Sequence, residues 1–214
     1  MQSYQKAFIQ LAIDNQVLRF GEFTLKSGRV SPYFFNLGQI ASGAAMATLA
    51  DAYVDALEAD GIEFDMLFGP AYKGIPLVAA LATAYARRGR DLPFAYNRKE
   101  AKDHGEGGTL VGAAPAGRVL IVDDVLTAGT ALRQSIELLR TAGAEPVGAA
   151  IALDRQERGP NGRSAVQEIE QEAGLKIVPL VTAREVLQFI SEGSADTETV
   201  AAMRRYQENY GIAD

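Results

Sequence analysis

The amino-acid sequence predicts an α/β fold: a mostly parallel central sheet flanked by helices, with a small N-terminal hood. Short apolar runs alternate with longer amphipathic segments along most of the chain, and this alternation is typical of parallel sheets. Residues 119–122, VLIV, are apolar at every position, which indicates a strand buried on both faces. About the first 40 residues depart from the alternation, because they combine one amphipathic helix with a hairpin. We expect these two elements to form the hood over the carboxyl edge of the sheet.

The individual elements follow from apolar spacing and from the turn residues at their ends. Apolar positions three or four residues apart predict helices, and short apolar runs bounded by glycine or proline predict strands. Residues 99–108 have no apolar periodicity and contain three glycines, so no element is predicted there. The predicted elements are a helix at 4–18, strands at 23–26 and 30–37 around a turn at 27–29, a helix at 44–59, a strand at 65–68, a helix at 75–88, strands at 93–96 and 119–122, a helix at 132–140, a strand at 146–153, a helix at 164–173, a strand at 176–181, and helices at 183–190 and 197–209.

Length, charge and cysteine content exclude several classes of protein. A chain of 214 residues is long enough for one α/β domain, and we expect residues 1–214 to form a single domain. The net charge of −6 argues against nucleic acid and acidic membranes as partners, so an anionic substrate would need a locally basic site. Without cysteine there is no disulfide, thiol nucleophile or zinc–thiolate site. The N-terminus lacks the apolar core of a signal peptide and no apolar run could span a membrane, so we expect a cytoplasmic protein.

An acidic pair and a small-residue loop follow the strand predicted at 119–122. Asp123 and Asp124 stand at its carboxyl end, where open α/β sheets bind ligands, and their carboxylates can accept hydrogen bonds from a vicinal diol. The loop 127–130, TAGT, precedes a helix whose N-terminal amides and dipole can hold a phosphate dianion. The alternative is an ordinary turn with a helix cap. The two features in this order favour a sugar-phosphate site.

Two further segments could hold anions. Residues 69–74, GPAYKG, join a strand to a helix, and their glycines allow close approach to an anion that Lys73 could neutralise. The alternative is an ordinary turn with a solvated lysine. Residues 98–108, RKEAKDHGEGG, could be a solvated surface loop, or a mobile lid whose cations close over a polyphosphate. His104, in this segment, is the one histidine of the chain.

The hairpin and the strand predicted at 146–153 carry candidates for recognition of a base. Phe34 and Phe35 are adjacent in a predicted strand, so their rings face opposite sides and at most one can stack on a base while the other packs inward. Arg155 could pair with a substrate carboxylate through two hydrogen bonds. Its alternative is a surface arginine paired with Glu157 or Asp154.

The chain resembles the orotate phosphoribosyltransferases, a branch of the type I phosphoribosyltransferase family, over nearly its whole length. Five motifs occur in the family order: FTLKSGRVSPYFFN, GPAYKG, RKEAKDHGEGG, VDDVLTAGTA and LDRQERG. The resemblance implies the type I phosphoribosyltransferase fold, a cis peptide at Ala71–Tyr72, and sites for phosphoribosyl diphosphate (PRPP) and orotate. The substrate-binding residues that it implies are Lys26, Phe34, Phe35, Tyr72, Lys73, Arg98, Lys99, Lys102, His104, Asp123, Asp124, Val125, Leu126, Thr127, Ala128, Gly129, Thr130, Ala131 and Arg155. The catalytic set among them is Lys26, Lys99, Lys102, His104, Asp123 and Asp124.

The resemblance also implies a reaction, a cofactor and a partner. The reaction is transfer of ribose 5-phosphate from PRPP to N1 of orotate, in pyrimidine biosynthesis. Mg²⁺ is implied as the cofactor, held mainly by substrate oxygens with no dedicated protein ligand set. The implied partner is a second copy of the chain, in a homodimer whose lids cover one another's sites. Two other readings stay open, namely a phosphoribosyltransferase for another base and a PRPP-sensing regulator. The acidic charge and the lack of an appended helix-turn-helix signal weigh against the regulator.

Overall fold

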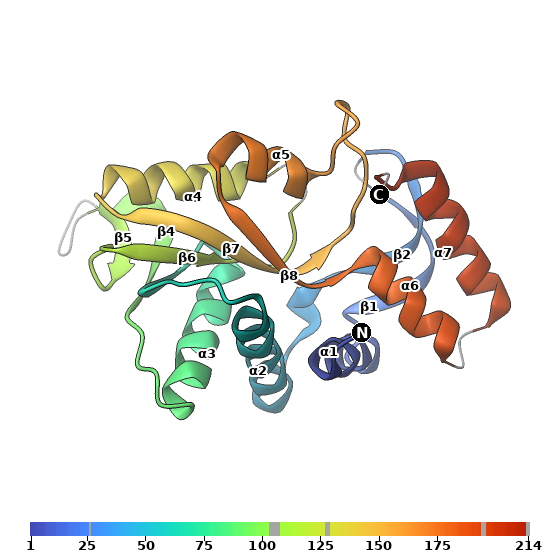
Figure 1. Cartoon of the computed structure of the whole chain (residues 1–214), viewed down its shortest axis with the longest axis horizontal. Coiled ribbons are helices and arrows are strands. Elements are labelled where there is room, and N and C mark those ends of the chain that lie inside the picture. The colour runs from blue at the N-terminus through green and yellow to red at the C-terminus, as the bar shows by residue number, and fades with distance from the viewer. Residues whose placement is uncertain (26, 103–107, 127–128, 194–195, 213–214) are drawn as a thin grey trace.

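A six-stranded sheet in the order β5-β4-β3-β6-β7-β8 forms the centre of the molecule (Figure 1). The computed structural model describes residues 1–25, 27–102, 108–126, 129–193 and 196–212. All neighbouring strands pair in parallel except β4 and β5, which are antiparallel, so the predicted mostly parallel sheet is confirmed. The strands are β3 (Met66–Gly69), β4 (Phe94–Lys102), β5 (Gly108–Gly112), β6 (Arg118–Val122), β7 (Glu145–Asp154) and β8 (Lys176–Thr182).

Helices cover both faces of the sheet, which explains the uninterrupted apolar run of β6. Leu120 and Val122 pack in the core shared with α2 (Gly43–Asp60) and α3 (Gly74–Arg87), whereas Val119 and Ile121 face the core under α4 (Thr130–Thr141) and α5 (Ala165–Ala173). Figure 1 shows α2 and α3 below the sheet and α4 and α5 above it. The predicted burial of this strand on both faces is confirmed.

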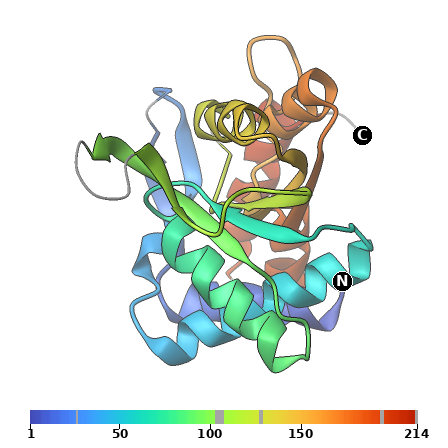
Figure 2. The same ribbon diagram turned by 90° about the vertical axis from the view of Figure 1, so that its left-hand side faces the viewer.

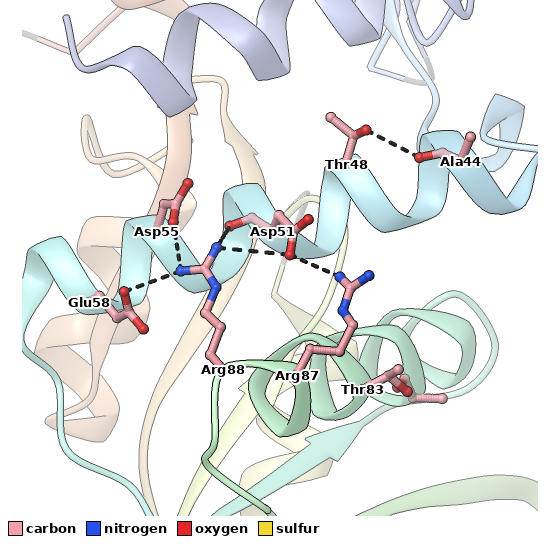
Figure 3. A network of polar contacts seen from close by, with 9 residues as sticks. Ala44, Thr48, Asp51, Asp55, Glu58, Thr83, Arg87 and Arg88 are labelled. Carbon is pink, nitrogen blue, oxygen red and sulfur yellow. Dashed lines mark hydrogen bonds and ion pairs between the residues drawn. The ribbon is translucent and has the colours of Figure 1, made fainter.

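An exposed cluster of opposite charges joins α2 to α3 (Figure 3). Arg87 reaches Asp51 at 3.0 Å, and Arg88 reaches Asp55 at 2.7 Å and Glu58 at 3.2 Å. These side chains are largely solvated, so each pair contributes about 0–1 kcal/mol. The cluster therefore adds little to the packing of α2 against α3, which comes mainly from their buried apolar side chains.

The predicted hood is only partly correct. The first helix, α1 (Ser3–Asp14), ends four residues before the predicted Leu18, because Gln16 has a left-handed backbone (φ 57°) that turns the chain into β1 (Leu18–Thr24). Phe8 and Ile9 pack in the core with α2, so α1 extends the helical layer. The hairpin of β1 and β2 (Val30–Phe35) is separate from the central sheet, and β2 contacts α7 (Thr197–Tyr210).

The segment predicted to lack structure, 99–108, contains the end of one strand and the start of another. β3 pairs with β4 only as far as Tyr96, and β4 then runs six residues further to Lys102, paired with β5 alone. Figure 2 shows this hairpin, in green, reaching out from the edge of the sheet. An extension of two strands that lies beyond the central sheet needs no apolar alternation, which is why the sequence pattern did not reveal it.

The remaining predicted elements are confirmed, with ends that differ by at most a few residues. Gly61, in the left-handed region at φ 77°, ends α2 as expected, and a short 3₁₀ turn, η1 (Leu37–Gln39), links the hairpin to that helix. Towards the C-terminus, α6 (Ala183–Glu192) and α7 follow β8. Within the described ranges, none of the helices combines the length and apolar character needed to cross a membrane.

Candidate functional site

The acidic pair lies at the carboxyl end of β6 and is held there by the neighbouring strand. The Asp123 N–H donates to the Ala150 carbonyl at 3.0 Å, and the Ala152 N–H donates to the Asp124 carbonyl at 2.8 Å. Both backbones are therefore fixed by β7 while the side chains remain at the sheet edge. This is the placement predicted from the sequence.

A buried tyrosine on α2 holds the backbone of Asp123 through a hydrogen bond. The Tyr53 hydroxyl donates to the Asp123 carbonyl at 2.8 Å, and burial holds the pKa of Tyr53 well above its usual value, so this hydroxyl stays a donor. The carboxylate of Asp123 accepts from the Asp124 N–H at 2.9 Å. Burial, together with the nearby charge of Asp124, raises the pKa of Asp123 to about 7. Asp123 therefore binds a proton more readily than an exposed aspartate does.

We expect the Asp123→Asn variant to gain thermal stability relative to the wild type as pH rises from 5 to 8. An aspartate in the unfolded chain has a pKa near 3.9, so between about pH 4 and 7 only the folded state keeps this proton. The free energy of unfolding therefore falls as pH rises through that window, and asparagine removes the effect. The measurement is the difference in Tm between variant and wild type at each pH.

The Asp51→Asn variant is the matched control, because it makes the same substitution at the exposed ion pair on α2. Its Tm difference from the wild type is expected to follow pH less steeply than that of Asp123→Asn. A Tm difference for Asp123→Asn that is the same at pH 5 and pH 8 would contradict the raised pKa.

The loop 69–74 is packed too tightly for any residue but glycine at its two ends. A Cβ at Gly69 would lie 2.2 Å from the Gly74 carbonyl oxygen, and one at Gly74 would lie 2.6 Å from Cδ of Pro70. The peptide bond between Ala71 and Tyr72 is cis, as the family resemblance implied. The Ala71 N–H donates to Oδ1 of Asn97 on β4 at 2.9 Å. The loop 69–74, which follows β3, is thus also anchored to β4 by this hydrogen bond.

Lys73 brings this loop and the acidic pair together. Its ammonium group donates to Asp124 in a short ion pair, with the lysine side chain 51% exposed and the aspartate side chain 13% exposed. The side chain of Tyr72 is 67% exposed. A cation and two carboxylates therefore lie at one sheet edge, as expected for a ligand that carries both hydroxyl and anionic groups.

The small-residue loop leads into α4 through a left-handed glycine. Gly129 has φ 70°, and a Cβ there would lie 2.3 Å from Cδ1 of Ile169. Thr130 and Ala131 are exposed in the first turn of α4, where N–H groups are available to an anion. The predicted residues Thr127 and Ala128 lie outside the described residues.

The two apolar members of this predicted set have structural roles. Val125 forms a parallel bridge with Leu153 of β7, and Leu126 packs in the core under α4. Contact of Leu126 with a substrate would therefore come from its backbone.

The predicted lid residues lie on the extension of β4 beyond β3. Lys99 is exposed, with its ammonium group 4.6 Å from the ring centre of Tyr72, and Arg98 is half-buried. The backbone of Lys102 ends β4. His104 lies outside the described residues, and so does Lys26 of the hairpin.

The two hairpin phenylalanines face opposite sides, as predicted. The ring of Phe35 lies 6.4 Å from that of Phe8 on the core side, whereas Phe34 lies 5.5 Å from Phe23. The guanidinium of Arg19 is 5.3 Å from the ring centre of Phe34. Phe35 is thus a core residue, and Phe34 is the ring of the pair left for a base.

Arg155 follows β7 at the same sheet edge as the acidic pair. Its Nε donates to Oε1 of Glu157 at 2.7 Å and its Nη2 to Oγ of Ser31 at 3.2 Å. Its guanidinium also lies 4.2 Å from the ring centre of Tyr33. The ion pair with Glu157 was the alternative to substrate binding, and it is present, but the arginine side chain is only 15% exposed and does not lie on the open surface. Through Ser31, Arg155 ties the hairpin to the carboxyl edge of the sheet.

Several supporting residues were not predicted as site residues. Tyr53 and Asn97 hold the backbone of the acidic pair and of the loop 69–74, while Ser31, Tyr33 and Tyr206 surround Arg155 and Glu157. Only Asn97 had a usable signal, because it is a polar residue between the predicted strand 93–96 and Arg98. Among the residues that the structure describes, no group of three or more histidine, aspartate and glutamate side chains could hold a metal ion.

Comparison with known proteins agrees with this geometry. Residues 37–178 match the phosphoribosyl transferase domain family. The chain is 56% identical over 213 residues to the orotate phosphoribosyltransferase of Thioalkalivibrio sulfidiphilus, a match that covers 99% of this chain and 100% of the relative. It is 55% identical to that of Saccharophagus degradans over the same shares. A crystal structure of orotate phosphoribosyltransferase from Francisella tularensis superposes with a TM-score of 0.86 at 42% identity, covering 95% of this chain and 98% of that one. The chain therefore belongs to the orotate phosphoribosyltransferase family, with the type I phosphoribosyltransferase fold.

Proposed function

We propose that the protein transfers ribose 5-phosphate from PRPP to N1 of orotate, giving orotidine 5-phosphate and pyrophosphate in pyrimidine biosynthesis. The bond from C1 of the ribose to pyrophosphate breaks as the bond from C1 to N1 forms. The observation that carries the proposal is the contact between Lys73 and Asp124. It supports the proposal because a cation that would bind pyrophosphate lies beside a carboxylate pair that would bind the ribose diol. The family relatives, more than half identical along the whole chain, support the same reaction.

The acidic pair would hold the ribose. Asp123 and Asp124 accept hydrogen bonds from its 2- and 3-hydroxyls, and their negative charge favours the positive charge that develops at C1. Lys73 would turn from Asp124 to the departing pyrophosphate, whose charge the lid cations also neutralise. The 5-phosphate would sit at the loop 127–131 and the first turn of α4. Catalysis in this scheme is positioning and charge stabilisation, with no covalent nucleophile.

Orotate would lie between the hairpin and Arg155. Arg155 pairs with its carboxylate, Phe34 offers a ring face, and Phe35 contributes through its backbone. Lys26 is assigned to the junction of PRPP and orotate. The hydrogen bond from Arg155 to Ser31 supports this arrangement, because it joins the two walls of the pocket.

Mg²⁺ fits this donor set as an ion bound mainly through the substrate. The acidic pair offers two carboxylates, one of them paired with Lys73, which is too few for a cage built from protein alone. When bound, the ion would supply positive charge to the pyrophosphate. The cation-rich lid (Arg98, Lys99, Lys102 and His104) would then close over PRPP, exclude water and protonate the leaving group, with Lys102 or His104 as the acid.

We further propose a cytoplasmic homodimer of single-domain chains, in which the lid residues other than Lys99 complete the partner's site. One apolar core joins α1, α2 and α7, which supports a single domain over 1–214. PRPP and orotate are anions that do not cross membranes unaided, which supports a shared cytoplasmic compartment. β4 runs six residues beyond its last pair with β3, about 20 Å at roughly 3.3 Å per residue, so the end of this extension lies away from the central sheet. Lys102, the last residue of the extension, is therefore assigned to the partner's site. Lys99, beside Tyr72 of the same chain, is assigned to its own site.

Mixing inactive chains tests the shared lid. A Lys102→Ala chain combined with an Asp123→Asn/Asp124→Asn chain is expected to recover up to about a quarter of wild-type activity, because a random mixture forms about half heterodimers, each with one intact site. Lys99→Ala replaces Lys102→Ala in the matched control, which is expected to stay inactive. The measurement is orotate consumption after subunit exchange. Recovery in neither mixture would contradict sharing of the lid.

The reaction itself is tested by mixing the purified protein with PRPP, Mg²⁺ and orotate and following orotate absorbance. Uracil, hypoxanthine and adenine run in parallel. Loss of absorbance with orotate alone, abolished by a chelator, is the expected result. Turnover of another base in place of orotate would overturn the proposal, and PRPP binding without any turnover would favour a regulator.

A further inference from the structure

The Arg155 guanidinium is held on three sides by described residues. Nε and Nη2 both reach Oε1 of Glu157, at 2.7 and 2.5 Å, and Nη2 also donates to Ser31. Tyr33 lies beneath the guanidinium, with its ring centre 4.2 Å away. Only 15% of the arginine side chain is exposed. Such contacts fix a planar group in one orientation.

Glu157 is in turn held by the C-terminal helix. The hydroxyl of Tyr206 on α7 donates to the same Oε1 at 3.0 Å, and the Tyr206 ring meets Tyr33 edge-on at 6.3 Å. Tyr206 is 6% exposed, so water does not compete easily for this hydrogen bond. Burial, with the charge of Glu157, raises the pKa of Tyr206, so its hydroxyl remains a donor.

The backbone around Glu157 is joined to the end of the same helix. Glu157 forms an antiparallel bridge with Gly211, the Arg158 N–H donates to the Tyr210 carbonyl at 2.7 Å, and the Ile212 N–H donates to the Gln156 carbonyl at 2.9 Å. The loop that follows Arg155 is therefore built onto a segment more than 50 residues later in the chain. The loop after β7, at the carboxyl edge of the sheet, and the end of α7 therefore form one structural unit.

The contacts with Glu157 and Ser31 occupy the edge of the Arg155 guanidinium that carries Nε and Nη2. The hydrogen bonds from Arg155 to Glu157 and Ser31 use Nε and Nη2, and Nη1 takes part in neither of them. A carboxylate approaching from the sheet edge would meet a donor whose direction Glu157 has already fixed. Prior alignment of this kind lowers the cost of binding.

We propose that Tyr206 is a positioning residue for base recognition, which acts through Glu157 to orient Arg155 toward the carboxylate of the base. This inference rests on the proposed role of Arg155 in holding orotate. Tyr206 touches no substrate in this scheme. Its effect is confined to the base half of the site, because the acidic pair and the loop 69–74 have other supports.

The test is the Tyr206→Phe variant, which removes only the hydroxyl. A hydrogen bond to a charged group is lost, so KM for orotate is expected to rise about 10-fold, while KM for PRPP and kcat stay within about 2-fold. Tyr210→Phe, the same change one turn further along α7, is the matched control and is expected to leave all three constants within about 2-fold of wild type. Glu157→Gln, which keeps an acceptor oxygen but loses the charge, is expected to raise KM for orotate by an intermediate factor.

Arg155→Ala in the same assay separates this inference from the function on which it rests. If Arg155→Ala raises KM for orotate and Tyr206→Phe does not, the positioning role is overturned and the base site stands. If Arg155→Ala leaves KM for orotate unchanged, the assignment of the base site itself is overturned. Equal losses in both KM values and kcat for Tyr206→Phe, with a lowered Tm, would show a merely structural role and would also overturn the inference.

Discussion

The Asp123→Asn/Asp124→Asn variant is expected to fold normally and to lose about 1000-fold in kcat/KM for PRPP. Each carboxylate would hold one ribose hydroxyl, and a hydrogen bond to a charged group is worth about 1.5–3 kcal/mol. Two of them supply about 3–6 kcal/mol, which corresponds to roughly 10²- to 10⁴-fold in rate. The substitution also removes the negative charge that would favour a positive C1.

The fold should survive because asparagine keeps the shape and an acceptor oxygen at both positions. Oδ1 of residue 123 can still accept from the N–H of residue 124, and the backbone bonds to β7 do not involve the side chains. The measurement is steady-state kinetics with PRPP varied, together with Tm. Asp51→Asn, the same chemical change on the surface of α2, is expected to stay within about 2-fold of wild type. Full activity in the double variant would remove the acidic pair from the site.

The sequence could predict the PRPP end of the site because each of its parts is local. Asp123 and Asp124 follow an apolar strand directly, and Lys73 lies between two glycines after another strand. The rule that parallel strands end at one edge then brings the two segments together without further information. The contact between Lys73 and Asp124 confirms that step.

The supports of the base end could not be predicted, because they depend on residues far apart in the chain. Tyr206 and Glu157 are separated by 49 positions, and Ser31 and Arg155 by 124. The sequence predicts a helix at 197–209 that contains Tyr206, and helical periodicity says nothing about the partner of its hydroxyl. The early end of α1 was missed for a related reason. The left-handed backbone there lies at Gln16, which is not a glycine, so no turn residue in the sequence marked the end of the helix.

The Gly69→Ala variant is expected to lose both stability and activity, because the loop 69–74 has no room for a methyl group. Its Cβ would lie 2.2 Å from the Gly74 carbonyl oxygen and 2.7 Å from Cγ1 of Val78. The first contact is with backbone and cannot be relieved by rotating a side chain, so the loop must move. Overpacking of this kind costs about 1–3 kcal/mol of unfolding free energy. A displacement of about 1 Å in a substrate-holding loop can cost about 100-fold in rate.

Gly43→Ala is the matched control, because a Cβ there, in the first turn of α2, meets no atom within 4 Å. Alanine is a better helix former than glycine, so this variant is expected to keep full activity and a Tm at or above that of the wild type. Urea unfolding and kcat/KM for PRPP measure both effects. If Gly69→Ala behaved like Gly43→Ala, the tight packing between the ends of the loop would not be needed to hold Lys73 beside Asp124. The loop would then have to be positioned mainly by its bond to Asn97.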